Sequence, residues 1–302
     1  MADEPLWTLD RVSLGPARLR EASLEIRRGV TAILGWSGAG KTSLLNILVG
    51  FEKPARGIIA GPRTIAWAPQ NGGLWPHCTV REHLQLVRAP AEEIDATLEA
   101  FDLAERSAAK PGELSAGERA RLSVARALLM KAEAVVLDEP LTHVDPARVD
   151  GYWKIVRDHL AASGASLVFA THEPERVLGE ASRVVCLHGG AVLHAGDVAA
   201  LYSDPGSPEL MSALGPGNWL TAAEAELWLD VPGDQARCFR PERIAIEPAH
   251  ISPIVVSAAH FRGAIAEVEL HHLGAATRRR FFHRPSGPLL REGEPAMIRL
   301  RE

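Results

Sequence analysis

Residues 30–42 read Val-Thr-Ala-Ile-Leu-Gly-Trp-Ser-Gly-Ala-Gly-Lys-Thr, and the rest of the chain is organised around them. The mostly apolar run Val30–Leu34 predicts a buried strand. A glycine-rich turn follows it, and the amphipathic segment Ser43–Val49 predicts a helix that ends at Gly50. A buried strand, a turn rich in glycine and a helix that opens with Lys41-Thr42 together predict a phosphate-binding loop.

The turn matches the pattern G-x-x-x-x-G-K-[ST]. Its glycines let successive backbone N–H groups converge on phosphate oxygens, and the positive N-terminus of the helix faces the same anion. Lys41 can reach the β- and γ-phosphates, and the Thr42 hydroxyl can ligate Mg²⁺. The alternative is a glycine-rich turn that binds nothing, which the preceding strand and the Lys-Thr pair disfavour. The expected phosphate-binding residues are Gly35, Trp36, Ser37, Gly38, Ala39, Gly40, Lys41, Thr42 and Ser43.

Length and composition limit the classes of protein to consider. A chain of 302 residues, 46% of them hydrophobic, suits about two domains with real cores. The net charge of −5 and the lack of a long single-sign run do not indicate nucleic-acid binding. Cys78, Cys186 and Cys238 lie far apart, which favours reduced thiols in a cytosolic protein over a disulfide framework.

Membrane insertion is not expected from the sequence. No apolar run approaches the length that crosses a bilayer. Residues 1–5 lack the basic and hydrophobic regions of a signal peptide. We therefore expect any membrane association to come through a partner.

The coarse pattern predicts an α/β domain followed by a small all-β domain. Short alternating segments before the loop predict antiparallel strands, and residues 57–60 and 64–68 read as two more short strands. Residues 79–109 read as helical. Continuous apolar runs at 134–137 and 166–170 predict central parallel strands. A hairpin and a helical tail follow, reaching about Leu214. Short β segments separated by Pro and Gly come after Gly215-Pro216-Gly217, so we predict domains at 1–214 and 215–302.

Polar residues follow the two apolar runs, at Asp138-Glu139 and at His172. In an open parallel sheet these ends converge on one crevice beside the phosphate loop. Phosphoryl transfer needs a metal, a residue that orients or deprotonates water and a sensor of the γ-phosphate. We expect Thr42, Asp138 and Gln70 at the metal, and Glu139, His172 and Gln70 in catalysis, with Glu139 as general base. Each residue also has an alternative without a catalytic role. Asp138-Glu139 would be only the polar end of a strand, His172 a hydrogen-bonded histidine, and Gln70 an ordinary loop residue.

Ser115 and Glu118 have the spacing of a helix capping box. A helix N-terminus approached by a small, glycine-containing segment is also an anion site. The two interpretations are compatible, and the second leads us to expect that this helix start faces another phosphate-bearing surface.

The motifs together resemble those of the ATP-binding-cassette (ABC) ATPases over roughly residues 5–213. In order, they are Gly35–Thr42, Gln70, Leu114–Glu118, Val135–Pro140, Leu141–Asp145 and Thr171-His172. The resemblance implies a cassette with a RecA-like parallel core, an antiparallel β subdomain and a helical subdomain. It also implies ATP and Mg²⁺ as cofactors and a homodimer, or a pair with a similar subunit, that sandwiches two ATP molecules. Ser115 and Gly117 would then contact the γ-phosphate held by the other copy, and Asp145 would contribute to nucleotide binding.

The chain departs from the family pattern at several positions. Ala116 and Glu118 replace the first Gly and the Gln of the usual Leu-Ser-Gly-Gly-Gln, which bears on the turnover rate, and residues 142–144 are larger than the family prefers. The aromatic residue that usually stacks on adenine is not evident, because residues 12–15 are non-aromatic. Trp7 is a possible substitute, or it is a core residue.

Two further segments resemble parts of bacterial importer ATPases. Leu74–Glu82 resembles the segment that forms a groove for a coupling helix of the membrane subunit. Phe239–Ile246 resembles the Arg-Pro-Glu strand of the oligonucleotide-fold-like (TOBE) domain in importers of oxyanions, ferric iron, polyamines and sugars. This implies a peripheral subunit on the cytoplasmic side of the inner membrane, with permease subunits and a periplasmic or lipid-anchored solute-binding protein.

Other functions stay open at this point. They are an ABC exporter ATPase, a soluble ABC ATPase acting on nucleic acid or ribosomes, and a regulatory module whose β domain senses a ligand. Arg278-Arg279-Arg280 would suit nucleic acid but favours a solvated strand face, so no nucleic acid is expected as a partner. His271-His272 would suit a metal, but no carboxylate or cysteine stands at ligand spacing.

Overall fold

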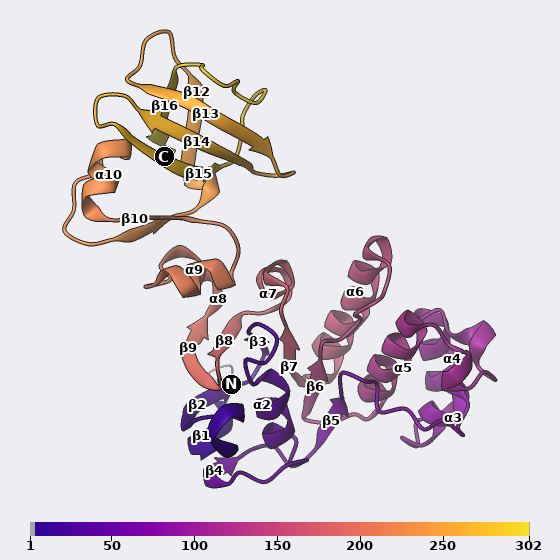
Figure 1. Ribbon diagram of the computed structural model, residues 1–302. Coiled ribbons are helices and arrows are strands. Elements are labelled where there is room, and N and C mark those ends of the chain that lie inside the picture. Colours follow the sequence, from indigo (N-terminus) through magenta and orange to yellow (C-terminus); the bar gives the residue numbers. More distant parts are fainter. Residues whose placement is uncertain (1–3, 302) are drawn as a thin grey trace. The chain divides into compact units, whose positions relative to one another are not determined.

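The computed structural model describes residues 4–301, without the side chains of residues 16 and 17 (Figure 1). Residues 1–3 of the segment examined for a signal peptide therefore lie outside the described range. Contacts divide the chain into two compact units, which meet between Val198 and Ala199. No helix within residues 4–301 is long and apolar enough to cross a bilayer.

The first unit is built around a six-stranded sheet in the order β5-β6-β7-β3-β8-β9. Its strands are β3 (Val30–Leu34), β5 (Ile65–Ala68), β6 (Ala134–Asp138), β7 (Ser166–Thr171), β8 (Arg183–His188) and β9 (Ala191–Asp197). All pairs are parallel except β8 with β9, which forms the predicted hairpin. The predicted central strands are confirmed, since β6 and β7 are buried along their whole length.

A second sheet of the first unit is antiparallel, as predicted. Its order is β2 (Ala22–Arg27), β1 (Pro5–Ser13) and β4 (Arg56–Ala60), with the short helix α1 (Gly15–Arg18) between β1 and β2. Apolar side chains of β1 and β2 pack in one core with the buried face of α2 (Lys41–Leu48). The strands β4 and β5 lie close in sequence but belong to different sheets.

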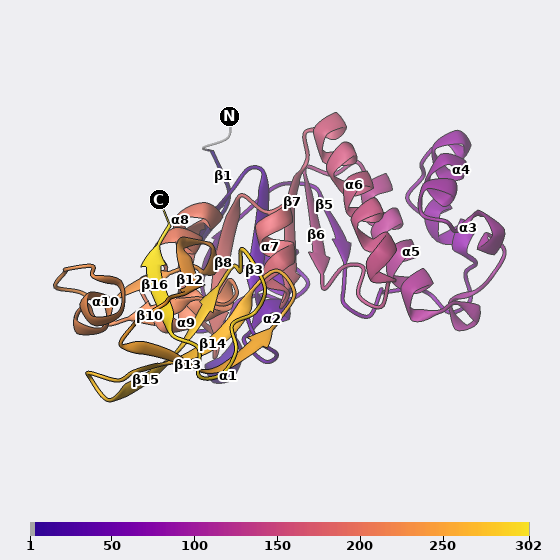
Figure 2. The ribbon, with the colours of Figure 1, turned by 90° about the horizontal axis from the view of Figure 1, so that it is seen from above.

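The helices of the first unit fall into two groups. Helices α2 and α7 (Pro174–Glu180) contact the central strands, and α6 (Pro146–Ser163) joins β6 to β7. Helices α3 (Val80–Gln85) and α4 (Ala91–Ala100) lie beside α5 (Ala116–Leu129), as the two ribbon views agree (Figures 1 and 2). The predicted helical region 79–109 is thus interrupted, because Arg88 has a φ of 59° and Pro90 precedes α4. Short 3₁₀ turns at Ala104–Arg106 and Pro111–Glu113 lead to α5.

The second unit consists mainly of antiparallel strands. Its elements after α8 (Val198–Ser203) are α9 (Pro208–Ala213), β10 (Asn218–Leu220), α10 (Ala222–Leu229), β11 (Arg237–Phe239), a 3₁₀ turn (Pro241–Arg243), β12 (Ile244–Pro248), β13 (Ile254–Phe261), β14 (Ala266–His272), β15 (Thr277–His283) and β16 (Ala296–Leu300). Strands pair as β10-β11, β12-β16 and β13-β14-β15. The predicted β character is confirmed, but α10 contributes Trp228 to the same core.

The side-chain contacts of Arg240 explain where the contacts divide the chain. Its buried guanidinium donates to the backbone carbonyls of Tyr202, Met211, Gly215 and Pro216. These bonds connect the segment 199–214 to the β-rich unit, whereas the domain boundary that we predict lies after residue 214. The domain boundary after residue 214 stays a prediction.

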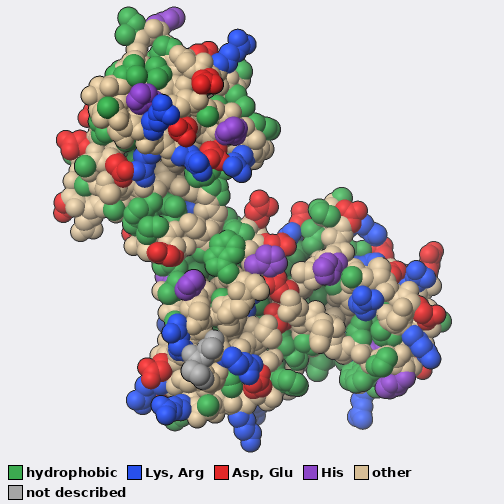
Figure 3. Space-filling view, in the orientation of Figure 1, with side chains coloured by type: hydrophobic (Ala, Val, Ile, Leu, Met, Phe, Trp, Pro, Cys, Tyr) green, Lys and Arg blue, Asp and Glu red, His purple; other side chains and the backbone are tan. Residues whose placement is uncertain are grey.

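The arginine run on β15 lies among carboxylates. Arg280 Nε is 2.9 Å from Glu267 Oε1, Arg278 pairs with Glu269, and Arg279 pairs with Glu224. In the unit that holds the C-terminus, Figure 3 shows blue cationic side chains interspersed with red acidic ones. This is the arrangement of a solvated strand face, as we interpret this run from the sequence.

Candidate functional site

A pocket of about 690 Å³ lies at the carboxyl ends of β3, β6 and β7. These three strands are neighbours in the sheet, so the residues that follow them meet at one edge. The predicted convergence is confirmed for most of the expected residues. Those that line the pocket are Trp36, Ser37, Gly38, Ala39, Gly40, Lys41, Thr42, Ser43, Gln70, Asp138, Glu139 and His172.

Backbone geometry explains the glycines of the loop. Gly38 and Gly40 have φ angles of +78° and +103°, a conformation that residues with a Cβ rarely adopt. A Cβ on Gly40 would also lie 2.5 Å from the carbonyl oxygen of Arg18. Lys41 Nζ donates to the Gly35 carbonyl oxygen at 2.7 Å, which closes the loop on itself. The backbone of the loop therefore wraps around the Lys41 ammonium group.

Thr42 and Asp138 connect the first turn of α2 to the end of β6. The Thr42 hydroxyl donates to Asp138 Oδ2 at 2.7 Å. The other carboxylate oxygen, Oδ1, is buried without a hydrogen-bond partner. A buried carboxylate oxygen without a partner is costly, and a hydroxyl beside a carboxylate supplies the oxygen ligands that Mg²⁺ prefers. The pair therefore fits a divalent cation that completes its coordination with phosphate and water.

Glu139 lies at the centre of a charged cluster. Its Oε1 is 3.2 Å from Lys41 Nζ, and its Oε2 is 2.9 Å from His172 Nδ1. The residue has a φ of 49°, which is uncommon for a side chain with a Cβ. Its N–H donates to the Ala170 carbonyl at 3.0 Å, and its own carbonyl accepts from the Thr142 hydroxyl at 3.0 Å. These bonds hold a buried carboxylate at the edge of the pocket, where it can accept a proton from water.

Gln70 follows β5 and is exposed at the pocket wall. It also lines a neighbouring cavity of about 300 Å³ together with Glu139. The segment after it is fixed to α5, because Arg126 donates to the carbonyls of Gly72 and Gly73. Gln70 and Glu139 therefore line the same cavity as Ala116 and Arg119 of α5.

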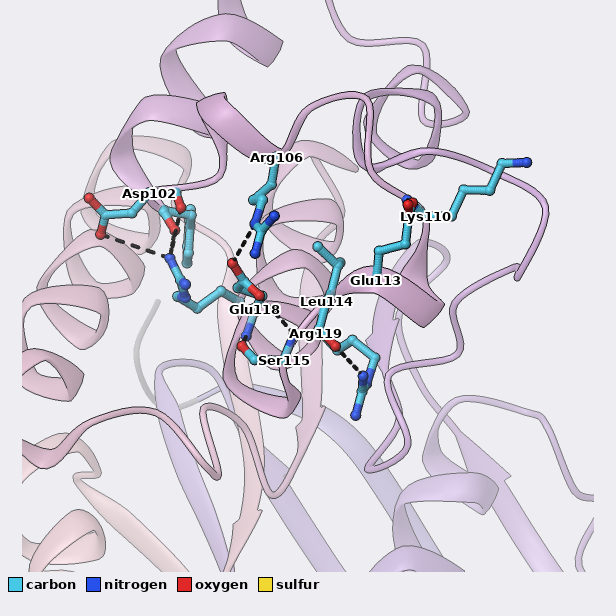
Figure 4. A network of polar contacts seen from close by, with 10 residues as sticks. Asp102, Arg106, Lys110, Glu113, Leu114, Ser115, Glu118 and Arg119 are labelled. Atoms are coloured by element: carbon cyan, nitrogen blue, oxygen red, sulfur yellow. Dashed lines mark hydrogen bonds and ion pairs between the residues drawn. The ribbon is translucent and has the colours of Figure 1, made fainter.

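The predicted capping box at Ser115 is confirmed (Figure 4). Ser115 N–H donates to Glu118 Oε2 at 2.7 Å, and Glu118 N–H donates to Ser115 Oγ at 3.2 Å. Arg106 Nε donates to the other Glu118 oxygen at 3.1 Å. The backbone hydrogen bond from Ser115 lowers the pKa of Glu118, so this acid is ionised at neutral pH. Glu118 therefore holds the helix start in place of the family's glutamine.

Four expected nucleotide-binding residues do not line the pocket of their own chain, and one of them, Gly35, contacts it only through the hydrogen bond that its carbonyl accepts from Lys41. Ser115 and Gly117 lie at the start of α5, where a Cβ on Gly117 would be 2.8 Å from the His143 carbonyl oxygen. Asp145 is exposed and caps α6 by accepting from the Ala147 N–H at 2.9 Å. Within one copy, the phosphate-binding loop and the surface that carries Ser115, Gly117 and Asp145 are therefore separate.

The structure corrects one interpretation and adds one residue. Trp7 is buried in the core, and its Nε1 donates to the Leu48 carbonyl at 3.0 Å, so the alternative that it stacks on a base is wrong. Arg18, which no motif predicts, lines the pocket. It lies in a short helix between two strands, and only the tertiary fold brings it to the loop.

Comparison with known proteins agrees with this geometry. A family model described as ABC transporter matches residues 19–142. The Fe(3+) ions import ATP-binding protein FbpC 2 of Rhodococcus jostii is 31% identical over 294 residues, covering 86% of this chain and 82% of that protein. The chain belongs to the ATP-binding subunits of ABC transporters. It is an ABC ATPase, and ATP is its nucleotide.

Further relatives place it within the ABC family. The thiamine import ATP-binding protein ThiQ of Cereibacter sphaeroides is 34% identical and covers 66% of this chain and 96% of that protein. The sulfate/thiosulfate import ATP-binding protein CysA of Thermosynechococcus vestitus is 31% identical and covers 76% and 74%, respectively. A solved structure described as the ATP binding subunit of an ABC transporter has a TM-score of 0.59 at 23% identity, covering 65% of this chain and 92% of that one. This last likeness shows the shared ABC fold.

Burial of Asp138 predicts a pH-dependent change in stability. Desolvation raises the pKa of this carboxyl, so the folded chain favours its protonated form more than the unfolded chain does. The charge therefore destabilises the fold above the raised pKa, and this cost vanishes once the pH falls below the ordinary carboxyl pKa. Without nucleotide or metal, we expect Asp138→Asn to have a higher Tm than the parent at pH 7, with the difference shrinking toward about pH 4.

Thermal denaturation across this pH range measures the effect. Asp158→Asn is the matched control, because Asp158 is exposed on α6 and its charge is already solvated. A lower Tm for Asp138→Asn than for the parent at pH 7 would contradict the assignment of Asp138 as a desolvated, under-compensated charge.

Proposed function

We propose that this chain is the ATP-hydrolysing subunit of a bacterial ABC importer, which energises uptake of a small solute through separate permease subunits. The observation that carries the proposal is the cluster of Lys41, Glu139 and His172 beside the Thr42–Asp138 pair in one pocket. The relatives reported above, all import ATP-binding proteins, support the direction of transport.

The residues of the pocket divide the work of phosphoryl transfer. The amides of the glycine loop and Lys41 hold the phosphates and neutralise their charge. Thr42 and Asp138, with Gln70 at the edge, would hold Mg²⁺, which supplies charge neutralisation between the β- and γ-phosphates when bound. Glu139 accepts the proton of the attacking water as its oxygen bonds to the γ-phosphorus and the bond to the β–γ bridging oxygen breaks.

His172 and Gln70 act around this step. The imidazole is hydrogen-bonded to Glu139 at 2.9 Å, so it orients the carboxylate, and its exposed ring can meet the γ-phosphate. Gln70 lies on the same wall and can orient water. Release of inorganic phosphate and ADP then returns the pocket to its starting state.

A second copy would complete the site. The helix start at Ser115 and Gly117 offers backbone N–H groups and a positive end, yet it is outside the pocket of its own chain. In a head-to-tail homodimer, or a pair with a similar subunit, these residues and Asp145 reach the nucleotide held by the other copy. This arrangement gives each copy half of two composite sites.

The partners follow from the importer proposal. Integral permease subunits would bind the surface around Leu74–Glu82, and a solute-binding protein would deliver the solute, which places this chain at the cytoplasmic face of the inner membrane. The relatives' names specify different solutes, namely Fe(3+), thiamine and sulfate or thiosulfate. We therefore propose only that the solute is a small one, of the oxyanion, metal-ion, polyamine or sugar class.

Replacing the proposed general base should separate binding from hydrolysis. We expect Glu139→Gln to bind ATP within a few-fold of the parent and to lower kcat by about 10²-fold or more, because the amide cannot accept the proton. Phosphate release and equilibrium ATP binding measure the two effects. Glu133→Gln is the matched control, since Glu133 is exposed just before the other end of β6. Undiminished turnover in Glu139→Gln would refute its role.

Association with a membrane subunit tests the importer proposal. We expect the affinity-tagged chain, purified in mild detergent from its own membranes, to carry integral membrane subunits. Trp75→Glu should reduce their recovery, because Trp75 is 44% exposed in the segment proposed to receive them. Leu193→Glu is the control, a charge introduced at a side chain of similar exposure (46%) on β9. Recovery of RNA or DNA in place of membrane subunits would contradict the proposal.

A further inference from the structure

The phosphate pocket has two distinguishable ends. Lys41 Nζ lies 3.2 Å from Glu139, which marks the end where the γ-phosphate is cleaved. Ser43, one residue beyond Thr42, marks the opposite end, and Arg18 Nε donates to its hydroxyl at 3.2 Å. Because the loop holds the phosphates in order along its length, the nucleoside emerges at the end where Arg18 lines the pocket.

The guanidinium of Arg18 is held in a fixed orientation. Its Nη1 and Nη2 donate to the two Glu52 carboxylate oxygens, both at 2.7 Å. Asn46 Nδ2 donates to the same carboxylate at 2.8 Å, and the Asn46 carbonyl accepts from the Glu52 N–H at 3.1 Å. A bidentate pair of this kind sets the plane of the guanidinium as well as its position.

These contacts argue against a phosphate as the ligand of Arg18. The hydrogen bond from Arg18 lowers the pKa of Glu52 to about 2, so the carboxylate is ionised at neutral pH and balances the guanidinium charge. A phosphate near Arg18 would meet this carboxylate as well. The edge of the guanidinium is engaged by Glu52 and Ser43, while the side chain remains 49% exposed. What Arg18 still offers to the pocket is a flat, cationic face.

We propose that the adenine ring of bound ATP stacks on the Arg18 guanidinium, which takes the place of an aromatic side chain in this chain. The inference rests on the proposed function, because it assumes that the pocket holds ATP. Guanidinium planes stack on aromatic rings and on nucleobases. The Arg18–Glu52–Asn46 network presets the plane, so little side-chain freedom is lost when the base arrives.

The other flat or upstream side chains are poorer candidates. Val12 and Leu14, which precede α1, are buried, as is Trp7. Trp36 lines the pocket and is 66% exposed. It directly follows Gly35, whose carbonyl accepts from Lys41 Nζ, so it lies at the γ-phosphate end. Arg18 is therefore the planar group at the nucleoside end.

Comparing two ligands that share their phosphates tests the proposal. MgADP and magnesium pyrophosphate differ only in the nucleoside, and neither is hydrolysed by this site. We expect Arg18→Ala to weaken MgADP binding about tenfold, because one stacking surface is lost. Pyrophosphate binding should stay within about twofold, since the loop is intact. Isothermal titration calorimetry measures both affinities on the full chain.

Two further variants separate planarity from charge, and a third is the control. Arg18→Trp restores a flat surface and should recover MgADP affinity, whereas Arg18→Lys keeps the charge without the plane and should stay weak. Arg20→Ala is the matched control, an exposed arginine that does not line the pocket, and should leave both affinities unchanged. If Arg18→Ala does not fold, the Trp and Lys variants still decide the question.

Several outcomes would overturn the inference. Equal loss of MgADP and pyrophosphate would make Arg18 a phosphate contact, and unchanged MgADP affinity in Arg18→Ala would remove its role. Selective loss of MgADP in Trp36→Ala, but not in Arg18→Ala, would move the stacking surface to Trp36. If the parent chain binds no MgADP and hydrolyses no MgATP, the proposed function fails, and the stacking inference fails with it. If the parent binds MgADP and Arg18→Ala binds it equally well, only the stacking inference fails.

Discussion

The hydrogen bond between the Thr42 hydroxyl and the Asp138 carboxylate is the contact on which the pocket depends. It joins the start of α2 to the end of β6, residues that are 96 positions apart in the chain. It satisfies one carboxylate oxygen and leaves the other buried without a partner. A charge in this state destabilises the fold until a cation compensates it. This unpaired oxygen supports our proposal that the nucleotide brings Mg²⁺ into the pocket.

The parallel sheet explains why these groups meet. Because β6, β7 and β3 are neighbours, Asp138, His172 and the glycine loop all emerge at the same edge. Glu139 is one residue past the end of β6 and adopts a positive φ there. This turn directs its carboxylate to Lys41 and His172 and not along the strand. Local backbone strain thus helps to place the carboxylate that we propose as the proton acceptor.

Much of this arrangement is predictable because its signals are local. The strand before the glycine loop, the apolar runs of β6 and β7 and the capping box at Ser115 are each encoded by neighbouring residues, and the structure confirms them. Features set by tertiary contacts are not predictable in this way. The sequence does not indicate that β4 and β5 join different sheets, or that Arg18 reaches the pocket through Glu52 and Ser43.

Ser115 and Gly117 lie away from the pocket of their own copy, so the proposed function requires MgATP to bring two copies together. Sedimentation velocity of the Glu139→Gln chain with saturating MgATP measures this directly, compared with Glu139→Gln carrying Ser115→Arg as well. A head-to-tail pair gives a dimer in the first case and a monomer in the second, with ATP bound in both. If the Glu139→Gln chain stays monomeric, or if adding Ser115→Arg leaves the dimer intact, the head-to-tail pair is contradicted.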